Sequence, residues 1–210
     1  MDSLRKLEEA FARFPGICPR QARRFVYYLL GKSPASIREL TQLIEEVRKA
    51  TTECPSCHRF FTHNDHKGAS AKADLCPICA DSSRDRASLM VVARDSDFET
   101  IEKSGAYKGL YFILGGTVPL LDNEPEKRIR LRQLLERVSG AKLKEIILSL
   151  NTTPDGEHTT DIVRDALGRI IGKDALQLTG VTVLGRGLST GAELEYVDSD
   201  TIKNALKNRA

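Results

Sequence analysis

The sequence predicts an α/β protein of several parts: a helical N-terminal region, a small zinc module, a domain built on a mostly parallel sheet, and a C-terminal tail. Two observations support this fold class. Two Cys-x-x-Cys pairs lie between residues 54 and 79, and after Ser88 short apolar runs alternate with amphipathic stretches. At 210 residues the chain is long enough for two or three small domains.

The first 50 residues predict three helices. In Ser3–Arg13, apolar residues recur at steps of three and four, as on one face of an amphipathic helix. The segment Phe14–Pro19 contains a Pro-Gly pair that breaks this helix. Pro19 begins a second helix, because proline is favoured at the first helical position, and this helix runs to about Leu30. A third helix covers about residues 36–50.

Four cysteines form two pairs, and eighteen residues separate the pairs. Two residues between cysteines let both thiolates of a tight turn point at one ion, and two such pairs complete a tetrahedron. The spacing is typical of a four-thiolate zinc site. We therefore expect one zinc ion per chain, bound by Cys54, Cys57, Cys76 and Cys79.

The sequence leaves two alternatives to this ligand set. Disulfides are one, but the N-terminus shows no signal-peptide pattern, and the fifth cysteine, Cys18, would stay unpaired. The other is a site of three cysteines and one histidine, since His58, His63 and His66 lie between the two pairs. The sequence favours four cysteines and leaves the histidines as exposed loop residues.

The region after Ser88 predicts strands that alternate with helices. Such alternation indicates right-handed crossovers and a mostly parallel sheet. Sheets of this kind place their binding loops at the carboxyl ends of the strands. We expect strands at about 89–93, 110–114, 145–150 and 181–184, and helices at about 97–103, 124–138 and 159–171.

Positive charge gathers in the N-terminal quarter of the chain. The net formal charge is +3, and residues 1–50 alone hold ten Lys/Arg against six Asp/Glu. A local excess of this kind suggests an anionic partner. No apolar run approaches the roughly 18 residues that a membrane helix needs, so we expect a cytoplasmic protein without membrane contact.

The second helix carries three arginines, Arg20, Arg23 and Arg24, at helical spacing on one face. The simplest interpretation is a solvated surface. The alternative is a DNA contact, in which the Pro-Gly hairpin at Gly16 offers backbone amides to one phosphate and the arginines reach its neighbours. Such contacts read no base sequence, so this mode suits non-specific binding of single- and double-stranded DNA.

The segment Phe14–Phe25 resembles the helix–hairpin–helix of the bacterial recombination mediator family RecR. That family has a helix–hairpin–helix, a four-cysteine zinc finger, a Toprim domain and a C-terminal tail, and this chain shows the same order over nearly its whole length. Five later stretches agree with the family: residues 101–116, 119–122, 145–148, 155–157 and 186–196.

The resemblance implies an organisation and a role. It places the helix–hairpin–helix in residues 1–52, the zinc finger in 53–84, the Toprim domain in 85–184 and an oligomerisation tail in 185–210. It implies a ring-shaped homo-oligomer, commonly a tetramer, that works on DNA with RecO- and RecF-like proteins in DNA repair. Its role would be to load recombinase onto single-stranded DNA without catalysing a reaction, as a nucleoid-associated protein. Asp155 and Glu157 are the candidates for contact with RecO.

The chain departs from the family pattern in its hairpin. Family hairpins usually read Gly-x-Gly, whereas this one ends in Cys18. If that position has a left-handed backbone, cysteine there would cost about 1–2 kcal/mol.

A second departure concerns catalysis. Toprim enzymes hold Mg²⁺ with a glutamate after the first strand and an Asp-x-Asp pair after the third. Here Ala93 stands at the first place and Asn151 begins the second. We therefore expect no catalysis. The alternatives are a Mg²⁺-dependent Toprim nuclease with displaced carboxylates, for which Asp95 and Asp97 are also available, and a zinc-stapled scaffold that binds only proteins.

Overall fold

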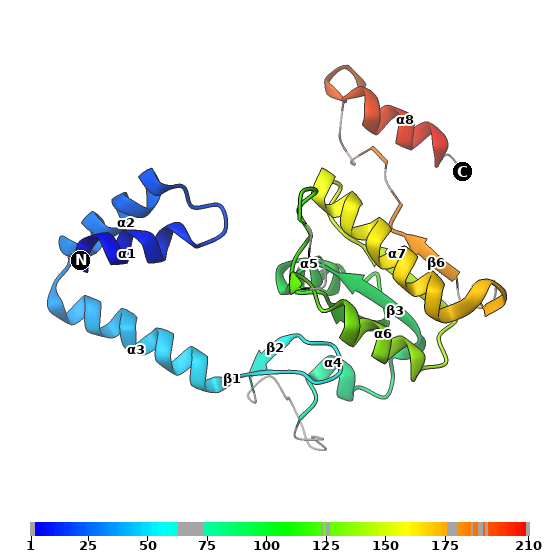
Figure 1. Ribbon diagram of the computed structural model, residues 1–210, viewed down its shortest axis with the longest axis horizontal. Helices are drawn as coiled ribbons and strands as arrows, with labels where there is room; N and C mark the ends of the chain where they lie inside the picture. Colours follow the sequence, from blue (N-terminus) through cyan, green and yellow to red (C-terminus); the bar gives the residue numbers. More distant parts are fainter. Residues whose placement is uncertain are drawn as a thin grey trace. The chain divides into compact units, whose positions relative to one another are not determined.

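The computed structural model describes residues 3–62, 74–122, 124, 127–175, 180–185, 187–188, 191 and 193–208, with only the backbone described for 171–175. The chain forms two compact units, residues 1–51 and 52–210. Each is described by itself (Figure 1).

The N-terminal unit is helical, as the sequence predicts. It consists of α1 (Ser3–Ala12), α2 (Pro19–Leu30) and α3 (Pro34–Ala50). Helices α1 and α2 pack together and bury Ala22 and Val26. Phe25 of α2 is 43% exposed, and its ring centroid lies 5.9 Å from that of Phe11 of α1.

Helix α3 begins two residues before its predicted start. Ser33 caps it by accepting a 3.2 Å hydrogen bond from the Ser36 amide, and Pro34 occupies the first turn, where no amide hydrogen is needed. All 17 residues of α3 are described, and none is buried.

The C-terminal unit starts with the cysteine-rich module. Strands β1 (Thr51–Glu53) and β2 (Phe60–Thr62) pair in a small sheet, and the short helix α4 (Pro77–Ala80) begins after Cys76 and contains Cys79. Phe61 is buried among the four cysteines, so the module has a small core of its own.

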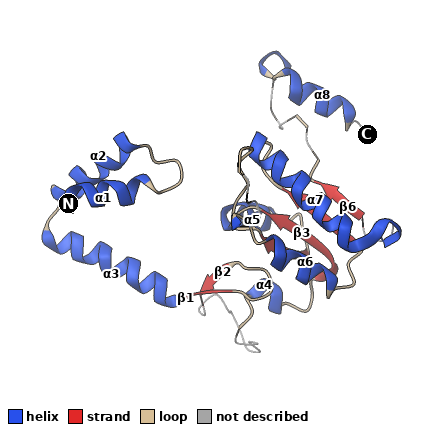
Figure 2. Cartoon of the chain, in the orientation of Figure 1, coloured by secondary structure: helices blue, strands red, loops and turns tan. Residues whose placement is uncertain are grey.

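A parallel sheet is the centre of this unit (Figure 2). Within the described residues it has four strands in the order β4-β3-β5-β6, and every neighbouring pair is parallel. The order places β3 between β4 and β5, so the chain crosses over the sheet, as the predicted alternation requires. The strands are β3 (Asp85–Val92), β4 (Gly109–Ile113), β5 (Glu145–Ser149) and β6 (Gly180–Val183).

Alternating side chains of β3 fill two cores on opposite faces of the sheet. Leu89 and Val91 join the larger core, which α6 (Leu131–Ser139) and α7 (Pro154–Ala175) cover. Met90 and Val92 join the second core with Phe98 of α5 (Asp95–Ser104). Both faces are therefore buried, which explains the nearly continuous apolar runs of these strands.

Three predicted elements in this unit have wrong boundaries. Helix α6 begins at Leu131 rather than at 124. Arg130, directly before it, has a non-helical backbone, and its amide donates to the Leu114 carbonyl at 2.8 Å instead of to a helical carbonyl. Helix α7 extends beyond the predicted 159–171 at both ends, and β3 starts four residues before Leu89. The tail contains a helix, α8 (Ser199–Lys207), that we did not predict; the Asp198 side chain caps it.

Candidate metal centre and nucleic-acid interface

The four cysteines lie together in the interior of their module. Their sulfur atoms are all within 4.8 Å of one another, and each residue is at most 4% exposed. Four sulfurs at about 2.3 Å from a zinc ion are separated by about 3.8 Å in a tetrahedron, so the donor set fits this metal. None of the four forms a disulfide.

The four thiols are buried and close together, so each one changes the protonation of its neighbours. Hydrogen bonds, first of all with Cys57, lower the pKa of Cys54, whereas the bond to Cys54 raises the pKa of Cys57. Cys79 also has a raised pKa because of its bond to Cys54. A buried group of this kind cannot hold four thiolates without a compensating positive charge, and a divalent metal supplies that charge.

The histidine alternative does not fit at His58. Its Nδ1 lies 2.6 Å from Glu53 Oε1, and it is not among the grouped metal-ligand atoms of the described residues. His63 and His66 lie outside the described residues. His58 has a left-handed backbone, with φ of 61°, directly after Cys57. The residue therefore turns the chain out of the first cysteine pair.

The metal module is joined to the carboxyl edge of the sheet. The Ile113 amide, at the end of β4, donates to the carbonyl of Cys57 at 2.9 Å, and the Phe60 amide donates to Asp95 Oδ1 at 3.0 Å. Arg130 Nε lies 3.4 Å from the same Glu53 oxygen that His58 contacts. Hydrogen bonds thus connect the cysteine module directly to the carboxyl ends of the strands in the parallel sheet.

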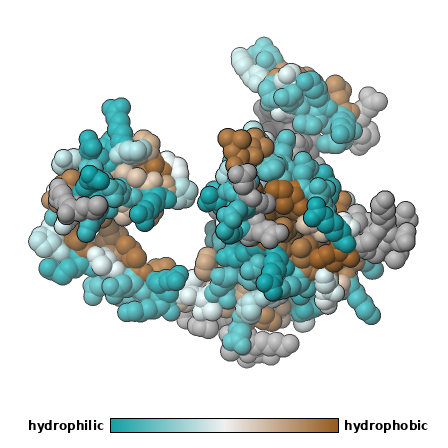
Figure 3. Space-filling view, in the orientation of Figure 1, coloured by the Kyte–Doolittle hydropathy of each residue, from teal (hydrophilic) through white to brown (hydrophobic). Residues whose placement is uncertain are grey.

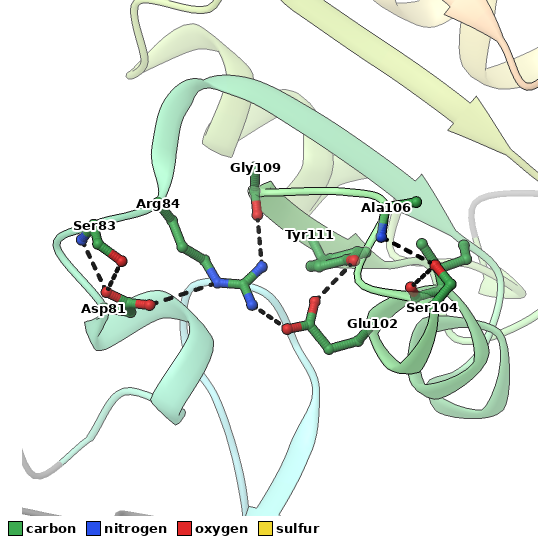
Figure 4. Close-up of polar contacts among 9 residues, drawn as sticks. Asp81, Ser83, Arg84, Glu102, Ser104, Ala106, Gly109 and Tyr111 are labelled. Atoms are coloured by element: carbon green, nitrogen blue, oxygen red, sulfur yellow. Dashed lines mark hydrogen bonds and ion pairs between the residues drawn. The ribbon is translucent and has the colours of Figure 1, made fainter.

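A second junction lies where the module leads into β3 (Figure 4). The Arg84 side chain, 10% exposed, donates to the Gly109 carbonyl at 3.1 Å and to the carboxylate of Glu102. The Tyr111 hydroxyl donates to the other Glu102 oxygen at 3.0 Å. Burial raises the pKa of Tyr111 well above its usual range, so the hydroxyl keeps its proton and remains a donor.

The carboxyl edge lacks the carboxylates of a Toprim enzyme at the expected places. Ala93 follows β3, is fully buried, and its carbonyl accepts from the Gly115 amide at 3.0 Å. Asn151 follows β5 and is exposed. Asp97 accepts from the Arg94 amide and so caps α5, while Asp95 is bonded to Phe60. Both of these carboxylates therefore have structural partners.

The two candidate partner-binding residues differ in their surroundings. Both lie in the first turn of α7. Asp155 is half-buried, and its Oδ1 accepts a 3.2 Å hydrogen bond from the Leu120 amide. Glu157 is exposed. The two carboxylates thus differ in exposure, although they lie in the same turn of α7.

The hairpin between α1 and α2 is a tight turn. The Ile17 amide donates to the Phe14 carbonyl at 3.1 Å, with Pro15 and Gly16 at the two central positions. Gly16 has φ of +77°, as expected for the third residue of a type II turn. Cys18 has φ of −82° and an extended backbone. The free-energy cost that we expected for a left-handed cysteine at this position therefore does not arise.

The three arginines of α2 are all exposed. Arg23 forms an ion pair with Glu8 of α1, with Nε and Oε1 3.2 Å apart. Among the described residues, no acidic group lies within ion-pair distance of Arg20 or Arg24. These two cations are thus the ones available to phosphates.

None of the helices that the structure describes combines the length and apolar character needed to cross a membrane. A helical hairpin, a four-cysteine cluster and a Toprim-type parallel sheet, in this order, define a protein of the helix–hairpin–helix and Toprim class. The family models agree: "RecR, helix-hairpin-helix" matches residues 4–48, "Toprim domain" 87–177 and "RecR, C-terminal" 187–210.

Curated relatives match over nearly the full length. Recombination protein RecR of Bifidobacterium longum subsp. infantis is 35% identical over 207 residues, covering 99% of this chain and 95% of that protein. Those of Ruegeria pomeroyi and Cereibacter sphaeroides are each 36% identical, over 97% and 98% of this chain and 93% and 95% of the relatives. The chain belongs to the RecR family of recombination proteins.

Proposed function

We propose that this protein is a non-catalytic mediator of recombination that binds DNA through its helical hairpin. Arg20 and Arg24 contact phosphates, Arg23 contributes less because Glu8 already pairs with it, and Gly16 shapes the turn whose amides approach the backbone. The observation that carries the proposal is the exposed pair Arg20 and Arg24 beside a glycine-dependent turn.

The bound DNA would be single- or double-stranded and of any sequence, because phosphate contacts read no bases. One hairpin binds weakly, so the proposal includes a ring-shaped homo-oligomer, a tetramer, in which several hairpins act on one DNA molecule. RecO- and RecF-like proteins are the proposed partners in loading recombinase, with Asp155 and Glu157 at the contact. The protein would act in the cytoplasm, at the nucleoid.

Zinc is the proposed metal, one ion per chain, held by Cys54, Cys57, Cys76 and Cys79. Its role is structural, because four protein ligands leave no open position for substrate or water. When bound, it neutralises the thiolates and stabilises the module that supports the carboxyl edge of the sheet.

A nuclease assay distinguishes the proposed mediator function from that of a Toprim nuclease. Buried Ala93 and exposed Asn151 replace the expected carboxylates, so plasmid and single-stranded DNA should stay intact with Mg²⁺ or Mn²⁺ while binding is observed in the same samples. Metal-dependent cleavage that disappears on Asp97→Asn or Asp155→Asn would show that the protein is an enzyme. Absence of DNA binding altogether would favour a scaffold that binds only proteins.

A further inference from the structure

Positive charge gathers where the chain enters the parallel sheet. The strands β3, β4 and β5 are parallel neighbours, so their starts lie at one edge, and we call the six residues before each strand the amino edge: 79–84, 103–108 and 139–144. These segments hold five basic residues and one acidic one, a net charge of +4. The six residues after each strand hold one basic residue and three acidic ones, a net charge of −2. The sheet therefore has a basic edge opposite an acidic one.

Two lysines of the amino edge lie on either side of β3. The Asp85 amide donates to the Lys108 carbonyl at 3.0 Å, and the Lys144 amide donates to the Ala87 carbonyl at 2.8 Å. Arg86 lies between these two bonds along β3. Neighbouring strands are about 4.8 Å apart, so the backbones of the two lysines are separated by about 10 Å. The three cations thus form a short row across the starts of three strands.

This row of cations does not take part in holding the fold together. Lys108, Arg86 and Lys144 are exposed, and among the described residues no acidic group lies within ion-pair distance of any of them. The nearby carboxylates of Asp85 and Glu145 each accept a hydrogen bond from the protein itself, at 2.8 and 3.3 Å. Strands have only small net dipoles, so cations at strand starts balance no backbone charge, unlike those in the last turn of a helix. The row is therefore available to an external anion.

The composition of the amino edge favours DNA over a folded protein as that anion. Interfaces between proteins have an apolar centre from which charged residues are depleted. None of the large hydrophobic side chains that are exposed in the described part of the chain belongs to the amino edge. Apolar surface is visible over α6 and α7 instead, where Ile170 lines a groove (Figure 3). DNA carries about one negative charge per 1.7 Å of its axis, so a row about 10 Å long meets several phosphates.

We propose that the amino edge is a second DNA-binding surface, in addition to the helical hairpin, and that Lys108, Arg86 and Lys144 contact phosphates there. This inference rests on the proposed function, in which the protein binds DNA. Phosphate contacts read no bases, so the edge adds affinity for any sequence. Each chain then offers two basic surfaces, one on each compact unit, and the two surfaces together strengthen the binding of one DNA molecule.

Fluorescence anisotropy of labelled single- and double-stranded DNA with the full chain, at several salt concentrations, tests the proposal. The double variant Lys108→Ala/Lys144→Ala should lower the slope of log affinity against log salt by about two per chain and weaken binding about tenfold. Its unfolding temperature should be unchanged, because only the backbones of the two lysines bond to β3. Lys127→Ala is the control, since Lys127 is an exposed lysine of the same unit that pairs with Glu124 at 2.6 Å. It should keep the wild-type slope.

The variant Lys108→Arg/Lys144→Arg keeps both charges and should bind DNA like the wild type. If it bound as weakly as the alanine variant, the lysines would act through the structure, and the amino edge would not be a DNA site. A wild-type slope in the alanine variant together with a lower slope in Arg20→Ala would overturn the amino edge and leave the proposed hairpin contact intact. Loss of binding to a poly-glutamate peptide, with DNA binding unchanged, would assign the edge to acidic proteins instead. A wild-type chain that does not bind DNA would contradict both the proposed function and this inference.

Discussion

The turn of the helical hairpin depends on the backbone conformation of Gly16. With φ of +77°, this position disfavours any residue with a Cβ, although no atom lies close enough to clash with one. Gly16→Ala should therefore destabilise the helical unit by about 1 kcal/mol. Gly31→Ala is the control, because Gly31 has φ of −80°. Thermal unfolding followed by circular dichroism should show a lower midpoint for the first variant only; equal midpoints would mean that the turn has another geometry.

Arg20 and Arg24 should account for much of the salt dependence of DNA binding. Replacing either with alanine removes one phosphate contact per chain, so affinity should fall about equally for all sequences. The slope of log affinity against log salt should fall by about one per lost contact. Fluorescence anisotropy at several salt concentrations measures both quantities.

Arg132→Ala serves as the control, since Arg132 is an exposed arginine of the other unit that pairs with Glu136. It should bind DNA like the wild type. If Arg20→Ala and Arg24→Ala also kept the wild-type affinity and slope, the hairpin would not be the DNA site.

At the scale of single elements, the zinc module should stabilise the strand ends that it contacts. Cys54→Ser or Cys76→Ser should lose the metal and lower stability, because a small module has little core of its own. The loss should also increase hydrogen exchange at Ile113 and Phe60, whose amides bond to Cys57 and Asp95.

Metal analysis and hydrogen-exchange mass spectrometry check this prediction. Cys18→Ser is the matched control, since Cys18 is exposed and lies outside the cluster. It should keep one zinc per chain and the wild-type exchange pattern. Zinc-free wild-type protein with Cys54–Cys57 and Cys76–Cys79 disulfides would contradict the assignment.

Helices, strands and the cysteine module could be predicted where neighbouring residues in the sequence determine them. Cysteine spacing and alternating apolar runs predicted the metal module and the parallel sheet, because both patterns follow directly from geometry. The predicted start of α6 was wrong, since apolar periodicity does not show that the Arg130 amide bonds to the Leu114 carbonyl instead of joining a helix. The bond from Leu120 to Asp155 joins residues 35 positions apart, and no sequence pattern could indicate that Asp155 holds a turn.

For the molecule as a whole, the proposed function requires an oligomer in which several helical hairpins bind one DNA molecule. We expect a single N-terminal excess of four positive charges to bind DNA weakly, and we expect linked copies to raise the effective concentration enough for stable association. Apolar side chains of α3 and of the tail, including Ile44, Val47 and Tyr196, are well exposed in one chain, which is consistent with surfaces that a second copy covers.

The molar mass in solution, measured by light scattering with and without a gapped DNA, tests this central claim most directly. The chain has a mass of 23.3 kDa. We expect a tetramer without DNA. When DNA is added, we expect one DNA molecule per tetramer, and the DNA should remain uncut. A protein that remains a monomer in both samples, or a tetramer whose mass is unchanged by DNA, would contradict it.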